Sequence, residues 1–304
     1  MRDLSGRSHM DVSIILASYN GVSTLPRTFA ALGEVTAPQG GIEIILVDNN
    51  SSDETAELMQ TFARQQGAVV LSEPKQGKAH ALNAGLEVAK GQLVVFTDDD
   101  TIADADWIVA FVTAATQNPD ISVFAGQIRP EWPTPPPEWL SGLARNGRSC
   151  ACTPEAVGEG PLPAWQAKGP NFMVRGDVAR TLRFGVDPQN YGEGQRARGN
   201  EDTDFVMRAA VASGGTVHYV PSATIRHIIR PHEMTLRAVF ERYVRIGVGQ
   251  PQLQPYTRLG VAGSILRAVG LIAAFTVTFQ RNRAVDQIVT LAMQIGRLKA
   301  LMRA

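Results

Sequence analysis

The chain has 304 residues, a length that suits one large α/β domain or one domain with an appendage. Its two cysteines, Cys150 and Cys152, are too few for a disulfide scaffold or a zinc site, and they predict a reducing, cytoplasmic compartment. Residues 226–304 hold 12 Arg and Lys but 3 Asp and Glu, a net charge of +9, whereas residues 1–225 carry −9. The net negative charge of residues 1–225 argues against a nucleic-acid-binding protein.

Residues 1–10 are polar, predict no signal peptide and are left out of the fold prediction. After them, short apolar runs alternate with segments of helical character. Strands are expected at residues 12–17, 42–47, 68–71, 93–97 and 121–128, with helices after all but the last, starting near residues 24, 54, 78 and 106. Because this strand–helix unit repeats, we predict an α/β protein with a doubly wound, mostly parallel sheet.

The composition changes after residue 128. Residues 130–163 are rich in proline and predict a long loop of the kind that often forms a lid or a binding wall. Beyond it we expect a strand and turn at 169–177, a mobile Gly- and Arg-rich segment at 185–199, a helix starting at 199–205, a last strand at 216–220 and a helix at 233–247. We divide the chain into a catalytic domain, 11–225, and a basic helical extension, 226–304.

The extension contains an apolar stretch, residues 259–279, that is interrupted by three glycines and Arg267. Its length leaves three roles open: a helix that packs on the core or on another subunit, an interfacial membrane helix, or a membrane span. Residues 288–298 have the spacing of an amphipathic helix. The basic extension therefore predicts either peripheral contact with the cytoplasmic face of a membrane or contact within a homo-oligomer.

Acidic residues follow two expected strands at their carboxyl ends. Asp98, Asp99 and Asp100 come directly after the apolar run that ends at Thr97. Carboxylates at this density suit Mg²⁺ or Mn²⁺, and the alternative is a solvated acidic turn. Asp48 ends the second strand in the same way, where a carboxylate accepts hydrogen bonds from a nucleobase imide or a ribose, or stabilises a turn.

Other candidates have an ordinary structural alternative. Lys78 opens a Gly- and Lys-rich helix start that favours an anion. Glu201 and Asp202 lie in a first helical turn, where acids complement the helix dipole, and one of them also suits a general base. Two further groups have a binding role or only a packing or solvated one: the tryptophans Trp132, Trp139 and Trp165, and the arginines Arg242 and Arg245.

These motifs together resemble the family 2 glycosyltransferases, inverting enzymes of the GT-A fold that use nucleotide sugars. Six segments in the family's order carry the resemblance: Ser18-Tyr19-Asn20, Val47–Asp53, Lys78–Gly85, Asp98-Asp99-Asp100, Gly169–Met173 and Glu201-Asp202. The Gln-x-x-Arg-Trp signature of processive synthases is absent, and Glu241–Arg245 stands in a comparable place. This departure disfavours a polymerising enzyme.

The resemblance implies transfer of a sugar, most simply from a UDP-sugar, to a saccharide or lipid-linked acceptor in cell-surface polysaccharide or glycolipid synthesis. It implies Mn²⁺ or Mg²⁺ on Asp100 and His227, and a base at Asp202 with Glu201. The implied donor-binding residues are Ser18, Tyr19, Asn20, Asp48, Asn50, Lys78, Asn83, Asp98, Asp99, Arg242 and Arg245. The implied acceptor-binding residues are Trp139, Trp165 and Asn171. The alternatives are a retaining GT-A transferase and a catalytically inactive sugar- or nucleotide-binding scaffold.

Overall fold

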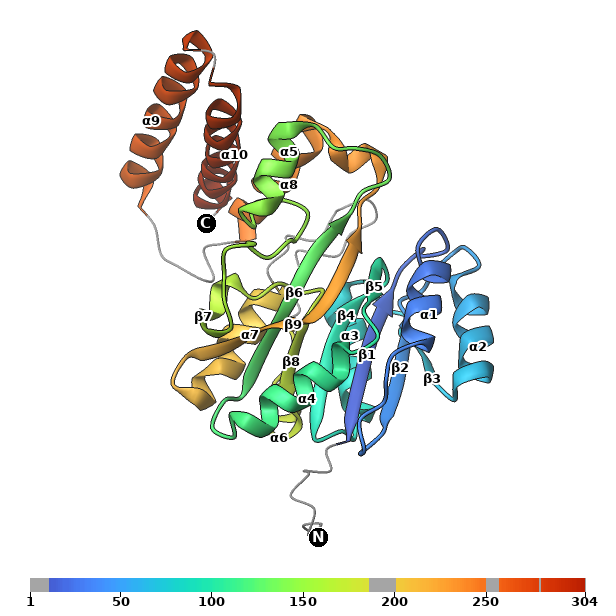
Figure 1. Cartoon of the computed structure of the whole chain (residues 1–304). Coiled ribbons are helices and arrows are strands. Elements are labelled where there is room, and N and C mark those ends of the chain that lie inside the picture. Colours follow the sequence, from blue (N-terminus) through green and yellow to red (C-terminus); the bar gives the residue numbers. More distant parts are fainter. Residues whose placement is uncertain (1–10, 186–200, 250–256, 279, 304) are drawn as a thin grey trace.

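A computed structural model describes residues 11–185, 201–249, 257–278 and 280–303. These residues form an α/β body built on one sheet, and a group of helices from the C-terminal part stands at one end of it (Figure 1). The doubly wound, mostly parallel α/β fold predicted from the sequence is confirmed. Apart from Gly185, the expected Gly- and Arg-rich segment at 185–199 lies outside the described residues.

In the described part of the chain, one sheet contains β1 (Val12–Ser18), β2 (Ile42–Asp48), β3 (Val69–Ser72), β4 (Leu93–Asp98), β5 (Thr101–Ala103), β6 (Val123–Glu131), β7 (Gly160–Pro163), β8 (Phe172–Arg175) and β9 (Thr216–Ile228). The order is β3-β2-β1-β4-β8-β6-β9-β5, with β7 paired to β9 beside this path. The first four strands in this order are parallel, and β8 is antiparallel to both of its neighbours.

The register of β1 aligns the carboxyl ends of three strands. Ser18 lies opposite Asp48 on β2, and Ala17 lies opposite Asp98 on β4. The apolar residues of β1 are buried almost throughout, as a central strand with both faces covered requires. The acidic residues at the ends of β2 and β4 therefore lie at one edge of the sheet, which is where open α/β sheets bind ligands.

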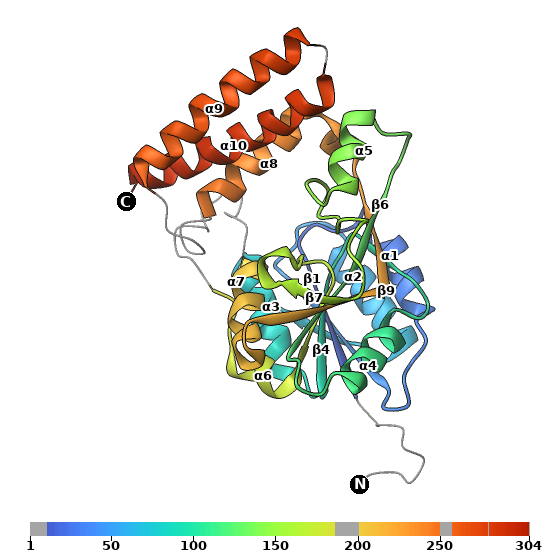
Figure 2. The ribbon, with the colours of Figure 1, turned by 60° about the vertical axis from the view of Figure 1, so that its left-hand side comes forward.

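Helices cover both faces of the sheet (Figure 2). One buried cluster holds residues of α1 (Leu25–Gly33), α2 (Thr55–Gln66) and α4 (Trp107–Gln117), and the other holds residues of α3 (Lys78–Val88), α6 (Gly176–Thr181) and α7 (Glu201–Ala210). α3 begins directly after Gly77, whose φ of 136° is readily adopted only by glycine. This turn places Lys78 at the start of α3, at the same edge of the sheet as the acids.

The prediction of a continuous loop at 130–163 is wrong. β6 continues to Glu131, the helix α5 (Glu138–Arg145) follows Pro137, and β7 ends the segment. Pro130 is tolerated because β8 pairs only with Val123–Ala125, so the outer half of β6 has β9 on one side only. The proline run stops where α5 begins, and proline is compatible with the start of a helix but not with its interior.

The last strand also extends beyond its predicted end at Val220. β9 continues through Pro221 to Ile228, and the register with β6 shifts between Gly126 and Gln127. Such an irregularity accommodates a proline within a strand. This extension carries His227 to the sheet edge, beside Asp100. It also runs through residue 225, where the sequence placed a domain boundary, and that boundary remains a prediction.

The C-terminal extension consists of α8 (Leu236–Gly249), α9 (Arg258–Val277) and α10 (Arg281–Arg303), and α10 packs against both others (Figures 1 and 2). α8 and α10 touch at Gly247 and Gly296, where a Cβ on either residue would lie 2.1 Å from a backbone oxygen of the other helix. Glycine is therefore required at this crossing.

The face of α9 that turns away from α10 is apolar and exposed. Leu259 is 86% exposed and Leu266 is 75% exposed, and only 11% of the most apolar part of α9 is buried. Among the described residues, α9 is the one helix long and apolar enough to cross a membrane. α9 packs on α10 of its own chain and buries Val261 and Ala268, and the three roles that the sequence left open for this apolar stretch remain predictions.

Candidate active site

A cavity of about 290 Å³ lies at the carboxyl ends of β1, β2 and β4. Side chains that the sequence predicted for different roles meet here: it is lined by Ala17, Ser18, Tyr19, Asn49, Lys78, Asp98, Asp99, Asp100 and Arg230. Strand register brings them together, since residues far apart in the chain end neighbouring parallel strands. The cavity is large enough for part of a nucleotide, and its lining is strongly charged.

The three consecutive carboxylates have different partners, which explains how they coexist. Asp98 Oδ1 lies 2.6 Å from Lys78 Nζ, and Asp99 accepts a hydrogen bond from the Ser18 hydroxyl. Asp100 lies 3.3 Å from His227 Nε2 and 3.5 Å from Arg230 Nη1. Each acid therefore meets a donor from a different part of the chain.

The pKa values of Asp99 and Asp100 shift in opposite directions. Burial, with the adjacent charge of Asp100, raises the pKa of Asp99 to about 7. Burial would also raise the pKa of Asp100, but the charges of His227 and Arg230 outweigh it and lower that pKa. Asp100 is therefore the carboxylate held in its charged form, which is the form that binds a cation.

The orientation of His227 is fixed by a backbone carbonyl. Its Nδ1 lies 2.8 Å from the oxygen of Cys150, and a carbonyl only accepts, so the proton sits on Nδ1. In the neutral ring Nε2 then has a free lone pair, directed at Asp100. Burial opposes the charged form of His227, yet the neighbouring Asp100 raises its pKa above the ordinary value. An ordered second nitrogen of this kind is typical of metal-binding histidines.

Asp100 and His227 fit a divalent cation that is bound together with a diphosphate. Asp100 Oδ1 is buried and lies 3.3 Å from His227 Nε2, and it makes no hydrogen bond to the residues that the structure describes. No group of three or more His, Cys, Asp or Glu side chains that could hold a metal occurs in the described ranges. Mg²⁺ sites in nucleotide-dependent enzymes commonly use one or two protein ligands, with phosphates and water completing the shell. Two protein ligands beside a phosphate-sized cavity therefore suffice.

Asp202 occupies the first turn of α7 and faces the same edge of the sheet. Its Oδ2 lies 2.9 Å from Lys78 Nζ, whereas its buried Oδ1 has no hydrogen-bond partner among the residues that the structure describes. Burial raises the pKa of Asp202 to about 6, even though Lys78 opposes this shift; Glu201 adds to it. Gly169 makes the position accessible, since a Cβ there would lie 1.9 Å from Asp202 Oδ2. A buried carboxyl with one free oxygen and this pKa has the properties of a general base.

Four residues predicted to bind the nucleoside lie where β1 and β2 end: Tyr19, Asn20, Asp48 and Asn50. Tyr19 is half exposed, and Asp48 is buried and accepts a hydrogen bond from the backbone of Ser51 at 3.2 Å. Asn20 and Asn50 both have φ in the left-handed region, 53° and 61°, which asparagine tolerates better than most residues. Asn20 Oδ1 accepts from the Ser52 backbone, so these asparagines shape the two loops that flank Asp48.

Two predicted binding residues have structural partners instead. Asn83 donates to the carbonyl of Phe184 at 3.0 Å and accepts from its amide at 2.8 Å. Asn171 is fully buried: it accepts from Trp107 Nε1 at 2.8 Å and donates to the carbonyls of Gln127 and Ala223. Its amide is thus fully used within the core, and direct contact of Asn171 with an acceptor is excluded by its burial.

Four other predicted binding residues do not line the cavity that contains the three acids: Trp139, Trp165, Arg242 and Arg245. Trp165 is 56% exposed on a short 3₁₀ helix, Ala164–Gln166, that packs against α7, the helix of the candidate base. Trp139 is partly buried on α5 and packs into a cluster shared with α8 and α10. Arg242 and Arg245, on α8, line a second cavity and not the one that contains the three acids.

Three contributors were not anticipated from the sequence. Arg230 reaches Asp100 from just beyond β9. Asn49 accepts from the Gly77 amide and donates to the carbonyls of Glu73 and Lys75, which holds the turn before α3 in place. Gly169 gives Asp202 its space. Asn49 could have been predicted from the sequence because it directly follows Asp48. The role of Gly169 could not, because it depends on a contact with Asp202 that exists only in the folded chain.

An open α/β sheet whose carboxyl edge gathers acids around a cavity is typical of enzymes that transfer groups from nucleotide-activated substrates. The family comparison makes this class specific: residues 13–172 match Glycosyl transferase family 2, and the chain belongs to that family. The resemblance carried by the motifs is therefore confirmed, and the protein is a glycosyltransferase.

Individual relatives agree with this. The chain is 25% identical over 266 residues to glycosyltransferase AglE of Haloferax volcanii, covering 87% of this chain and 81% of that protein. It is 35% identical over 127 residues to the undecaprenyl-phosphate 4-deoxy-4-formamido-L-arabinose transferase of Pseudomonas aeruginosa, covering 40% of this chain and 36% of that one. In fold it resembles the mannosyltransferase PcManGT from Pyrobaculum calidifontis in complex with GDP-Man and Mn²⁺, with TM-score 0.64, 15% identity and coverage of 98% and 89%.

Proposed function

We propose that this glycosyltransferase inverts the transferred sugar, moving it from a nucleoside diphosphate sugar to an acceptor hydroxyl in one displacement. The observation that carries the proposal is the geometry of Asp202, whose Oδ2 is bound by Lys78 while the buried Oδ1 has no hydrogen-bond partner in the described part of the chain. A single base beside the donor cavity is sufficient for attack from the face opposite the leaving group, which inverts the anomeric centre.

The donor is proposed to lie across the carboxyl ends of the strands. Its nucleobase and ribose contact Tyr19 and Asp48, and an imide N–H on the base donates to the Asp48 carboxylate. The resemblance of the Asp48 segment to a uracil-contacting one favours a UDP-sugar. The diphosphate lies near Asp98 and Asp100, with Ser18 and Lys78 within the same cavity.

Asp100 and His227 would hold Mn²⁺ or Mg²⁺, and Asp98 lies toward the ribose. When bound, the ion neutralises charge that develops on the departing diphosphate. Asp202 accepts the proton of the attacking hydroxyl at Oδ1, while Lys78 keeps Oδ2 in a fixed position and lowers the cost of the buried charge. Glu201, adjacent in the same helical turn, adds negative charge that keeps the Asp202 carboxylate basic.

The acceptor is proposed to be lipid-linked, with synthesis at the cytoplasmic face of a membrane for a cell-surface polysaccharide or glycolipid. Support comes from the exposed apolar face of α9, from the net charge of +9 after residue 225, and from the undecaprenyl-phosphate substrate in the name of one relative. Trp165, exposed beside α7, is the aromatic side chain best placed to stack on an acceptor sugar.

The proposal is tested by nucleotide release from a panel of UDP-, GDP- and dTDP-sugars, with Mn²⁺ and then with EDTA. We expect release of one nucleotide that EDTA abolishes and that Asp100→Ala reduces by at least tenfold. NMR of the anomeric proton during the first turnovers then gives the stereochemistry. Product with retained configuration would overturn the single-displacement mechanism, and full activity in EDTA would overturn the metal site.

A further inference from the structure

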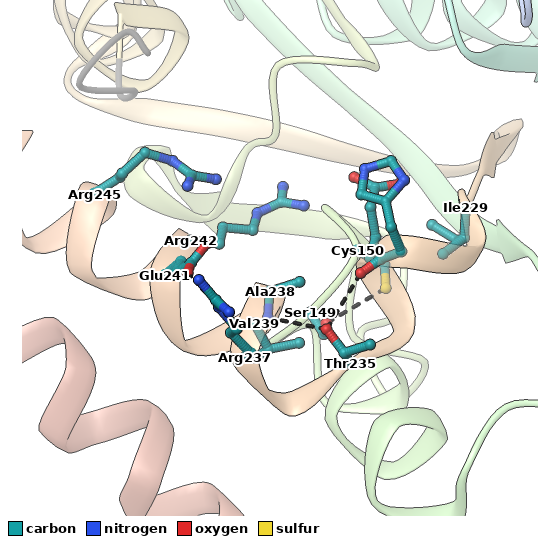
Figure 3. Close-up of a pocket in the computed structure, with 12 residues that line it drawn as sticks. Ser149, Cys150, Ile229, Thr235, Arg237, Ala238, Val239, Glu241, Arg242 and Arg245 are labelled. Atoms are coloured by element: carbon teal, nitrogen blue, oxygen red, sulfur yellow. Dashed lines mark hydrogen bonds and ion pairs between the residues drawn. The ribbon is translucent and has the colours of Figure 1, made fainter. Parts of the chain in front are cut away.

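A second cavity, of about 450 Å³, lies beside α8. Figure 3 shows its lining: Arg242 and Arg245 leave neighbouring turns of α8 in the same direction, Cys150 comes from the loop that faces the helix, and Ile229 follows the end of β9. The full lining is Ser149, Cys150, Ile229, His232, Glu233, Thr235, Arg237, Ala238, Val239, Glu241, Arg242 and Arg245. Its volume lies within the range of small-molecule sites.

The acidic side chains in this lining already have partners. Glu241 accepts from Arg237 Nε at 2.9 Å, and the Glu233 carboxylate accepts from the Arg230 backbone at 2.9 Å. In contrast, Arg242 makes no hydrogen bond or ion pair within the residues that the structure describes. The cavity therefore contains an arginine whose five N–H donors are available to a ligand.

Lys168 is a second cation whose charge interacts with that of Arg242, although it is not one of the residues that line this cavity. Burial lowers the pKa of Lys168, and the positive charge of Arg242 lowers it further. Within the described ranges, no carboxylate forms an ion pair with Lys168. Two neighbouring cations without a counter-charge repel one another and destabilise the fold, and a bound anion reverses the sign of this term. Arg and Lys side chains together are the usual recognition groups for phosphate.

This site shares a wall with the donor cavity but is separate from it. Cys150 lines the second cavity, and its carbonyl holds His227 Nδ1 on the opposite side of the wall. Ile229 lines the second cavity, whereas the next residue, Arg230, lines the donor cavity. Lys168 directly precedes Gly169, which packs against Asp202.

We propose that Arg242 binds a phosphate group carried by the acceptor, with the charge of Lys168 adding to the attraction, so that this cavity is an acceptor-phosphate subsite. The phosphate anchors the acceptor and is not itself the nucleophile, because a phosphate oxygen would need no base, whereas Asp202 is built as one. The inference rests on the proposed function and names its acceptor class. Its location on α8, which packs through α10 on the exposed apolar α9, favours a phosphate borne by a lipid.

The proposed subsite changes the binding role expected for Arg242 and Arg245. The sequence placed Arg242 and Arg245 with the donor diphosphate, but the donor cavity has its own cations, Lys78 and Arg230. Loss of Arg242 is therefore expected to weaken the acceptor and spare the nucleotide.

Calorimetric titration of the full chain with citronellyl phosphate, citronellol and inorganic phosphate, all in one detergent, tests the proposal. We expect citronellyl phosphate to bind at least tenfold more weakly to Arg242→Gln than to wild type. The control Arg64→Gln, which removes the same charge from the distant helix α2, is expected to bind like wild type. Titration with UDP or GDP in Mn²⁺ is expected to be unchanged in both variants. Lys168→Gln, on a different segment, gives an independent measurement if Arg242→Gln does not fold.

Three results would overturn the inference. Equal binding of citronellol means an apolar site, and equal binding of inorganic phosphate means a site for free phosphate. Loss of nucleotide binding in Arg242→Gln returns that residue to the donor. Because these titrations need no turnover, a failure of the nucleotide-release assay leaves their outcome unaffected, and the proposed function and this inference can fail separately.

Discussion

Lys78 Nζ lies 2.9 Å from Asp202 Oδ2, so the first residue of α3 and the first turn of α7 are joined through one ion pair. The same ammonium lies 2.6 Å from Asp98 at the end of β4. Burial would lower the pKa of Lys78, but the two carboxylates raise it well above its ordinary value. One cation therefore allows a base and a donor-site carboxylate, which would otherwise repel, to lie close together.

Replacing the base is expected to remove turnover and spare donor binding. Asp202→Asn keeps the shape of the side chain but cannot accept a proton, so nucleotide release should fall by about 10²–10⁴-fold. Titration with the nucleotide in Mn²⁺ should give nearly the wild-type affinity. Asp204→Asn, in the same helix and paired with Arg208 at 2.7 Å, is the control and should retain activity. Equal loss in both variants would assign the effect to the helix and not to the base.

The activity is expected to fall in acid. The base acts as a carboxylate, so kcat/KM should be constant above the pKa of Asp202, about 6, and fall tenfold per pH unit below it. Lys78 lowers that pKa, so in Lys78→Gln the acid limb of the profile should move to higher pH. Lys75→Gln, an exposed lysine three residues earlier, should leave the limb in place. An acid limb that does not respond to Lys78→Gln would belong to another group.

A methyl group at Gly169 is expected to displace the base. The Cβ of Gly169→Ala would lie 1.9 Å from Asp202 Oδ2 and 2.6 Å from its Cγ, so the carboxylate must move away from Lys78. A misplaced catalytic group commonly costs on the order of 10²-fold in rate. Gly158→Ala, where nothing lies within 4 Å, is the matched control. We expect the loss in the nucleotide-release assay for Gly169→Ala alone; wild-type rates there would show that Asp202 tolerates displacement.

Asn171 is expected to contribute to stability and not to acceptor binding. Asn171→Ala removes the partner of Trp107 Nε1 and of two backbone carbonyls, and leaving buried polar groups unpaired costs about 1–3 kcal/mol. Chemical denaturation should report this loss. Asn282→Ala, on the surface of α10, should stay within about 0.5 kcal/mol of wild type. An unchanged unfolding free energy with a raised KM for the acceptor would contradict the structural role.

The position of the acidic residues at the sheet edge could be predicted because each acid directly follows an apolar strand in a short segment of the sequence. An apolar strand followed by Asp98, Asp99 and Asp100 favours a ligand-binding edge over a solvated acidic turn. Asp48 is predicted in the same way, because it ends the neighbouring expected strand. The prediction of a long loop at 130–163 was wrong because it took the prolines to exclude a strand. A strand tolerates Pro130 because the outer half of β6 has a neighbouring strand on one side only, and this depends on the sheet and not on the local sequence.

The sequence by itself determined the α/β architecture, the family and the cluster of acids at the strand ends, because periodicity, turn residues and short motifs are local properties of the chain. Only the tertiary structure decided that Asn171 is buried, that Arg242 lines a separate cavity and that Asp202 shares Lys78 with Asp98. The two ion pairs of Lys78 join residues 20 and 124 positions apart, and the burial that sets the pKa of Asp202 arises only when such segments pack together.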